Sequence, residues 1–237
     1  MNNTHQWRPI SRLYVAVVFL AGLPTELRGH IPGANITWNR EVSRIVYERC
    51  ASCHRPGGTA FSLMTYQDAQ PRAAVIKEAV LSRRMPPWGA VKGFGDFRND
   101  QGLTQEQIEL ITDWVEGDAP RGNNPKMLPA PPKFDSSSPR TLPPKGVVVT
   151  GDVTIDHAIR LDGLLPEKVP NGASMQIIAR LPNGSIAPLL WLYEYRDSYR
   201  HPFLFRRPIE LPPGTMIRGV QPGARLLLMS DQRAKSR

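Results

Sequence analysis

The chain has 237 residues and a mass of 26.5 kDa, enough for one large domain or two small ones with their own cores. Hydrophobic residues make up 41% and charged residues 22%, which excludes a coiled coil, a collagen-like chain and a wholly disordered protein. The net charge of +9 raises the question of a nucleic-acid partner, and its answer depends on where the charges lie.

An apolar run over residues 13–23 follows Arg8 and Arg12 at the N-terminus. Eleven residues are too few to cross a hydrocarbon core, which needs about 20, but suit the apolar part of a secretory signal. We therefore expect residues 1–29 to be a signal peptide with an undefined cleavage site, and the protein to be periplasmic or otherwise extracytoplasmic. An uncleaved membrane anchor is the alternative.

Apolar residues at three- and four-residue spacing predict helices over residues 39–53, 66–83 and 104–117. The third has the clearest boundaries, since Thr104 and Gln107 form a capping-box pattern and Gly117 ends it. Pro71 is expected in or near the first turn of the second helix, where its missing N–H does little harm. Residues 30–119 are thus predicted to form a compact all-α domain.

Proline then becomes frequent, with eight of these residues in the predicted linker 120–146. After it the hydrophobic period drops to two, which predicts a small antiparallel β-sandwich-like domain over residues 147–230 and a polar tail over 231–237. The expected strands are short and separated by Gly, Pro and Asn turns: 147–149, 153–155, 175–181, 186–193, 203–205, 216–220 and 225–229.

Both cysteines fall in one pentapeptide, Cys50-Ala51-Ser52-Cys53-His54. This pattern is the attachment motif of a c-type haem, in which each thiol forms a thioether and the adjacent histidine becomes the proximal iron ligand. A thioredoxin-like site would need a βαβ context, structural zinc would need four ligands, and a disulfide would explain neither the histidine nor the helix. The motif therefore predicts one covalent haem c on Cys50, Cys53 and His54.

Met85, in the sequence Arg83-Arg84-Met85-Pro86-Pro87-Trp88, is the predicted distal iron ligand. The prolines keep the loop out of a helix, so that the thioether can be held toward the iron; simple core packing is the alternative. Arg83 and Arg84 are expected to pair with haem propionates or to be solvated. Trp88 is expected to pack on the haem or in the core beneath it. A His/Met pair raises the reduction potential and suits an electron carrier.

Residues 38–119 resemble the small cytochrome c domains of bacterial multidomain secreted proteins. The resemblance lies in the Cys50–Gly58 motif, the Arg84–Trp88 motif and the segments Phe61–Leu63 and Ile111–Val115. It implies thioethers at both cysteines, a proximal His54 and a distal Met85. With the strands that follow, it leads us to expect an all-α cytochrome c-like haem domain followed by a small antiparallel β-sandwich-like domain.

Residues 174–215 resemble, more weakly, the second half of copper type II ascorbate-dependent monooxygenase-like domains. Those enzymes carry a closely spaced histidine pair where this chain has Pro170-Asn171-Gly172-Ala173. Only His157 and His201 remain in this region, and two scattered histidines do not form a copper site. We therefore expect a copper-free relic or docking module, because a fold does not carry the activity of its relatives.

These features predict a monohaem periplasmic electron carrier rather than an enzyme. Residues 120–237 hold seventeen Lys and Arg against nine Asp and Glu, so the second region is expected to dock acidic or membrane-bound redox proteins or to contact a membrane peripherally. Nucleic acid is not expected, because no binding motif accompanies these charges. The alternatives are a haem peroxidase or oxidase subunit with a displaceable Met85, and a structural subunit of a larger membrane redox complex.

Overall fold

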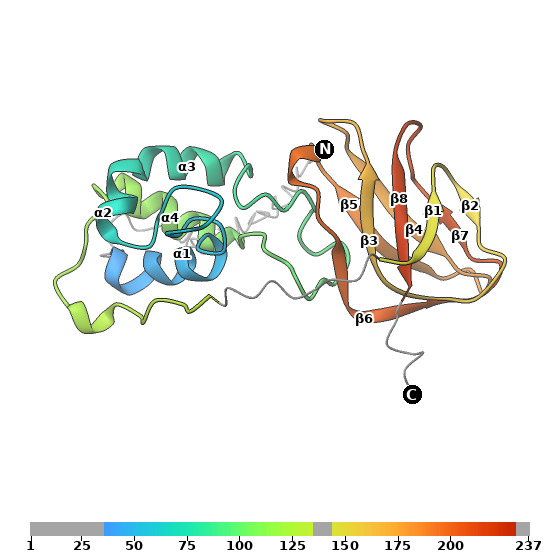
Figure 1. The fold of residues 1–237 in the computed structure, drawn as a ribbon, viewed down its shortest axis with the longest axis horizontal. Helices are drawn as coiled ribbons and strands as arrows, with labels where there is room; N and C mark the ends of the chain where they lie inside the picture. Colours follow the sequence, from blue (N-terminus) through green and yellow to red (C-terminus); the bar gives the residue numbers. More distant parts are fainter. Residues whose placement is uncertain (1–35, 135–143, 231–237) are drawn as a thin grey trace, which may run out of the picture. The chain divides into compact units, whose positions relative to one another are not determined.

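The computed structural model describes residues 36–134 and 144–230 (Figure 1). The predicted signal peptide, part of the linker and the polar tail lie outside these residues. Within the described ranges, no helix combines the length and apolar character that crossing a membrane requires.

The helices occupy the first part of the described chain. The α-helices are α1 (Ser43–Arg49), α2 (Tyr66–Ala69), α3 (Ala73–Leu81) and α4 (Gln105–Glu116). A π-helical turn, η1 (Trp38–Val42), precedes α1, and 3-10 turns occur at η2 (Gln70–Arg72) and η3 (Pro125–Met127). The helix predicted over 66–83 is divided at η2, because Pro71 lacks the N–H that a continuous helix needs.

Helix α4 begins as its sequence predicts. Thr104 Oγ1 accepts a hydrogen bond from the Gln107 N–H at 3.1 Å, and the Thr104 N–H donates to Gln107 Oε1 at 3.0 Å. Its buried Trp114 packs on Trp38 with ring centroids 6.1 Å apart. The Trp114 Nε1–H and the Trp38 N–H both donate to the Pro120 carbonyl, at 3.0 Å each. The first residue of the predicted linker is therefore part of the packed helical region.

Eight strands form two antiparallel four-stranded sheets, with the orders β1-β8-β3-β6 and β2-β7-β4-β5 (Figure 1). The strands are β1 (Gly146–Val149), β2 (Val153–Thr154), β3 (Ile159–Lys168), β4 (Met175–Arg180), β5 (Ile186–Leu192), β6 (Phe203–Leu211), β7 (Met216–Arg218) and β8 (Arg225–Ser230). Inward side chains of both sheets share one buried cluster, so the sheets pack as a sandwich. A short 3-10 turn, η4 (Asp197–Tyr199), precedes β6.

Strand β3 was not predicted from the sequence, although it lies between β8 and β6. It contains Asp162, Gly163 and Pro166, which are typical turn residues. The pairing register shifts between Leu161 and Gly163, and a Cβ at Gly163 would lie 2.4 Å from the Phe203 carbonyl oxygen. The glycine therefore allows close strand approach at a bulge rather than a turn.

The predicted fold class, an all-α haem domain followed by a β-sandwich-like domain, is wrong. The structure is mostly β: its strands contain more residues than its α-helices, of which α2 is a single turn and the others are short. The residues between α3 and α4 are not helical, and two of their aromatic side chains, Trp88 and Phe97, belong to the buried cluster of the sheets. Aromatic burial against the strands therefore fixes this part of the chain.

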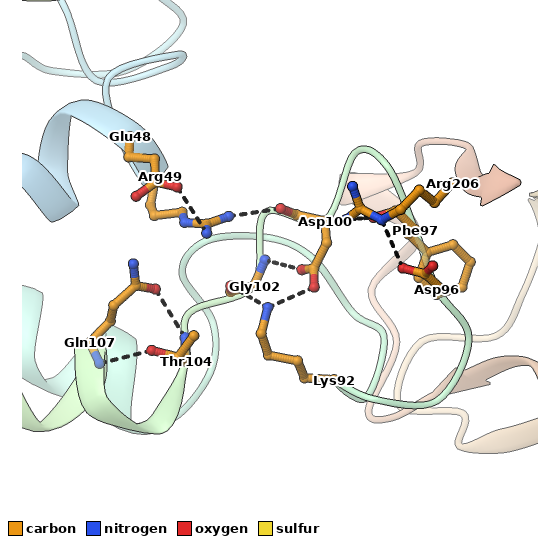
Figure 2. A network of polar contacts seen from close by, with 10 residues as sticks. All are labelled: Glu48, Arg49, Lys92, Asp96, Phe97, Asp100, Gly102, Thr104, Gln107 and Arg206. Atoms are coloured by element: carbon orange, nitrogen blue, oxygen red, sulfur yellow. Dashed lines mark hydrogen bonds and ion pairs between the residues drawn. The ribbon is translucent and has the colours of Figure 1, made fainter.

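We call residues 82–104 the connecting segment, because they lie between α3 and α4 and bond to the sheets. The Val91 N–H donates to the Trp191 carbonyl, the Arg98 N–H to the Leu204 carbonyl, and the Arg206 N–H to the Asp96 carbonyl, each at 2.8 Å. Figure 2 shows the side-chain contacts of the same segment, including Arg206 Nε to Asp96 Oδ1 at 3.0 Å and Lys92 Nζ to Asp100 Oδ2 at 2.6 Å. The segment thus continues the sheet packing into the helical region.

Candidate functional site

One cavity of about 290 Å³ brings together four residues predicted from the sequence as haem ligands or attachment points: Cys50, Cys53, His54 and Met85. Most of its other walls are apolar, and the largest of these side chains are Phe61, Leu63, Val75, Ile76 and Val80. The cysteines and His54 come from the end of α1 and the loop after it, and Met85 comes from the connecting segment. Residues more than thirty positions apart in the sequence therefore share one apolar chamber.

The cysteine motif forms a turn that continues from α1. Cys50 caps the helix, and its N–H donates to the Val46 carbonyl at 2.9 Å. The N–H groups of Cys53 and His54 both donate to the Cys50 carbonyl, at 3.1 and 2.9 Å. This turn places both sulfur-bearing residues at the cavity, and the two thiols are not joined by a disulfide. Burial raises the pKa of the Cys50 thiol to about 12.

The loop after the motif packs tightly against it. The Gly58 N–H donates to the Arg55 carbonyl at 2.9 Å, and the Ala60 N–H returns to the Cys53 carbonyl at 3.2 Å. A Cβ at Gly58 would lie 2.2 Å from the Cys53 carbonyl oxygen, closer than real Cβ atoms approach. A glycine is therefore required for the chain to fold back on the cysteine turn.

The His54 imidazole has a defined orientation. Its Nδ1 lies 3.0 Å from the Phe61 carbonyl oxygen, and because a carbonyl can only accept, Nδ1–H donates this bond. The proton on Nδ1 leaves the Nε2 lone pair as the donor for a metal. The Phe61 ring stands edge-on to the imidazole, with centroids 4.7 Å apart, and restricts its rotation. This is the geometry that a proximal histidine needs.

Met85 is placed by the end of α3. The N–H of Arg83 donates to the Val80 carbonyl at 3.1 Å and that of Arg84 to the Ala79 carbonyl at 3.0 Å, the bond pair of a Schellman motif. The cap puts Arg83 in the left-handed region, with φ of 52°. The Met85 N–H also donates to the Ala79 carbonyl, at 3.1 Å, so the half-buried methionine follows directly from a fixed helix end.

Arg83, Arg84 and Trp88, the other predicted haem contacts, do not line this cavity. Both arginines border a different cavity of about 320 Å³, together with residues of the turn after β5. Arg84 pairs with Glu78 Oε1 at 2.6 Å. Trp88 is only 5% exposed and stacks on His201, with centroids 5.0 Å apart and planes at 18°. Of the two roles considered for Trp88, the structure places it in the protein core.

Two arginines that the sequence did not single out, Arg49 and Arg72, border the cavity instead. Arg49 Nη1 donates to the Asp100 carbonyl at 2.8 Å and Nη2 pairs with Glu48 Oε1 at 3.0 Å (Figure 2). Its Nε is buried and has no hydrogen-bond partner among the described residues. The adjacency of Arg49 to Cys50 was the available sequence signal, since a residue beside the motif must lie near what the motif binds.

The two histidines of the sheet region lie apart from this cavity. His157 is exposed and contacts Asp156 Oδ1 through Nδ1 at 2.6 Å, whereas His201 is half-buried against Trp88. Across residues 36–134 and 144–230, no three His, Cys, Asp or Glu side chains gather as a metal site. A haem needs no such group, because its macrocycle supplies four of the iron ligands.

The residues of the cavity fit a haem c. Two thiols stand three residues apart on one wall, a histidine presents a free Nε2, a methionine supplies a thioether, and the remaining walls are mainly apolar. Comparisons with protein-family models, with curated proteins and with solved structures gave no match. The resemblances described above therefore depend on the motifs alone.

Proposed function

We propose that the protein attaches one haem c covalently through Cys50 and Cys53 and carries single electrons outside the cytoplasm. The observation that carries this proposal is the single cavity shared by Cys50, Cys53, His54 and Met85. Side chains that only filled the core would not need to include two free thiols, an oriented imidazole and a thioether around one apolar cavity.

The roles of the residues follow from their placement. Cys50 and Cys53 would hold the haem through thioethers, each formed by adding a thiol S–H across a vinyl double bond. His54 would bind the iron through Nε2, and its Nδ1–H bond to the Phe61 carbonyl fixes the ring and increases its basicity. Met85 would offer its thioether sulfur to the iron from the connecting segment. The bound haem supplies the ferric/ferrous couple, which a His/Met pair biases toward the reduced form.

Exposed apolar side chains at the cavity support the same proposal. Phe61 is 51% exposed and Val75 is 62% exposed, and both line the cavity. Large apolar surfaces open to water are unfavourable unless another group covers them. A macrocycle in the cavity covers them and explains why these positions are apolar.

Electron transfer is proposed in preference to catalysis, because binding and redox cycling of a six-coordinate haem account for the residues of the cavity. The partners are proposed to be acidic or membrane-bound redox proteins in the periplasm, attracted by the positive excess of residues 120–237. Association should then weaken as ionic strength rises. No copper is part of the proposal.

The test is covalent haem attachment to the full chain, made in a bacterial host that exports it and assembles c-type cytochromes. Denaturing mass spectrometry should find one haem retained on the peptide that contains residues 50–54. Replacing both cysteines, as Cys50→Ala with Cys53→Ala, should abolish retention, whereas Ser52→Ala between them should not. A wild-type chain that leaves the host without covalent haem contradicts the proposal.

A further inference from the structure

The loop that carries Met85 is held on its far side by the sheets. Trp88, three residues after Met85, has its indole stacked on the imidazole of His201, with centroids 5.0 Å apart. Its ring edge also meets Phe203, with centroids 4.9 Å apart. Phe203 begins β6 and His201 lies two residues before it, both more than a hundred residues further along the chain.

A hydrogen bond also joins His201 to Trp88. His201 Nε2 lies 3.2 Å from the Trp88 carbonyl oxygen, and Nδ1 lies 3.1 Å from the Pro202 carbonyl oxygen. Since a carbonyl only accepts, the ring makes the bond to Trp88 as its Nε2–H tautomer, in which Nδ1 has no proton to donate to the Pro202 carbonyl. His201 thus contacts both the backbone and the side chain of Trp88.

The constraint on Trp88 passes to Met85 through a short stiff turn. The Trp88 N–H donates to the Pro86 carbonyl at 2.8 Å, and Pro86 and Pro87 have fixed φ angles. On the other side, the Met85 N–H is held by the Ala79 carbonyl. Few backbone rotations therefore remain free between Trp88 and the methionine.

The residue after Trp88 is also fixed to the sheets. The Gly89 carbonyl accepts from the Tyr193 N–H at 3.1 Å, directly after β5. The loop end beyond Met85 is therefore anchored to β5 and β6, while its beginning is anchored to α3.

We propose that His201 is a positioning residue that acts through Trp88 to hold Met85 at the cavity, so that the sheets set how firmly the sixth iron ligand is bound. This inference rests on the proposed function. A ligand on an already ordered loop loses less conformational entropy when it binds than one on a free loop. Loosening the loop should therefore favour dissociation of the methionine, faster entry of external ligands and a lower reduction potential.

The test compares His201 variants of the haem-loaded full chain with a variant of His157, the other histidine in the loops between the strands. His201→Ala should speed imidazole binding to the ferric protein at least about fivefold, since one hydrogen bond and one ring stack are lost. His201→Phe keeps a ring and His201→Gln keeps a donor, so each should show a smaller increase. His157→Ala should bind imidazole at the wild-type rate, because His157 is exposed, pairs with its neighbour Asp156 and does not line the cavity.

A second readout does not depend on the haem. In the full chain that carries Cys50→Ala and Cys53→Ala, amide hydrogen exchange at Trp88 should be faster with His201→Ala than without it, because the turn from Pro86 to Trp88 is no longer clamped. If His201→Ala does not fold, His201→Gln and His201→Phe provide the comparison.

The inference is overturned if the His201 variants keep the wild-type potential and imidazole-binding rate, even if they unfold at lower temperature. The proposed function does not depend on this outcome. It stands as long as the wild-type protein shows the long-wavelength absorption band of sulfur-ligated haem iron. A wild-type protein that binds no haem, or shows no such band, contradicts the proposed function itself and the inference with it.

Discussion

The two walls of the cavity are built in different ways. The proximal wall, residues 50–63, is held by hydrogen bonds between near neighbours, such as His54 Nδ1 to the Phe61 carbonyl and the His54 N–H to the Cys50 carbonyl. The distal wall, Met85 to Pro87, depends through the neighbouring Trp88 on His201 and Phe203 from a distant part of the chain. A local motif can thus specify the proposed covalent site, whereas the position of Met85, the proposed sixth ligand, depends on the tertiary fold.

The largest expected effect comes from removing the link between the distal wall and the sheets. Trp88→Ala deletes a buried side chain that contacts His201, Phe97 and Phe203, and should cost about 3–5 kcal/mol of unfolding free energy. Denaturant unfolding measures this loss. The variant should keep covalent haem but lose the methionine ligand.

Trp88→Phe is the conservative control, and it should retain part of both stability and ligation. Loss of covalent haem in Trp88→Ala, with the fold retained, would show that the two walls are not independent.

The second-largest effect is expected at the proximal wall, where Gly58 packs against the cysteine turn. Gly58→Ala forces a Cβ toward the Cys53 carbonyl oxygen, which the loop relieves only by shifting, at about 1–3 kcal/mol. Haem attachment in the exporting host should fall, as mass spectrometry would measure. Gly57→Ala is a matched comparison: its φ of 72° strains any side chain, but no atom lies within 4 Å of the added Cβ. Equal attachment in the Gly58→Ala and wild-type chains would rule out the tight packing.

A smaller effect should come from the arginine beside the cysteine motif. Arg49→Gln removes a positive charge at the cavity and should lower the reduction potential, because a nearby cation favours the electron-rich ferrous state. Redox titration measures the shift. Arg44→Gln is the control in the same helix, since Arg44 bonds to the Met127 carbonyl and does not line the cavity. If Arg44→Gln lowers the reduction potential as much as Arg49→Gln does, the effect comes from the overall charge of the protein and not from a cation at the cavity.

The smallest expected effect is a gain in stability at the end of α3. Arg83 occupies the left-handed region, which glycine adopts without strain, so Arg83→Gly should raise the unfolding free energy by about 0.5–1 kcal/mol. Thermal unfolding of the haem-loaded protein measures this change. A loss of haem or a lowered potential in Arg83→Gly would instead give Arg83 the haem contact expected from the sequence.

The sequence predicted the features that local chemistry determines. The capping box of Thr104 and Gln107 forms as expected, and the spacing of Cys50 and Cys53 places both at one cavity. Met85, the predicted distal ligand, lines the same cavity, and it directly follows the fixed end of α3.

What the sequence did not predict depends on contacts between distant residues. Trp88 and Phe97 could not be assigned to the core of the sheets, since nothing local distinguishes an aromatic residue that contacts a cofactor from one that contacts a strand. Strand β3 was missed because Gly163 and Pro166 favour turns, and only its place between β6 and β8 makes it a strand. These two omissions explain why the predicted fold class, an all-α haem domain followed by a β-sandwich-like domain, was wrong.

We propose that one cavity supplies both axial ligands of a covalent haem, and a redox-titrated absorption spectrum of the native, haem-loaded protein is the sharpest test. We expect a single one-electron transition and, in the ferric state, the long-wavelength band of sulfur-ligated iron, which Met85→Ala should abolish. A ferric spectrum without this band, or a band that persists in Met85→Ala, would rule out Met85 as the sixth ligand.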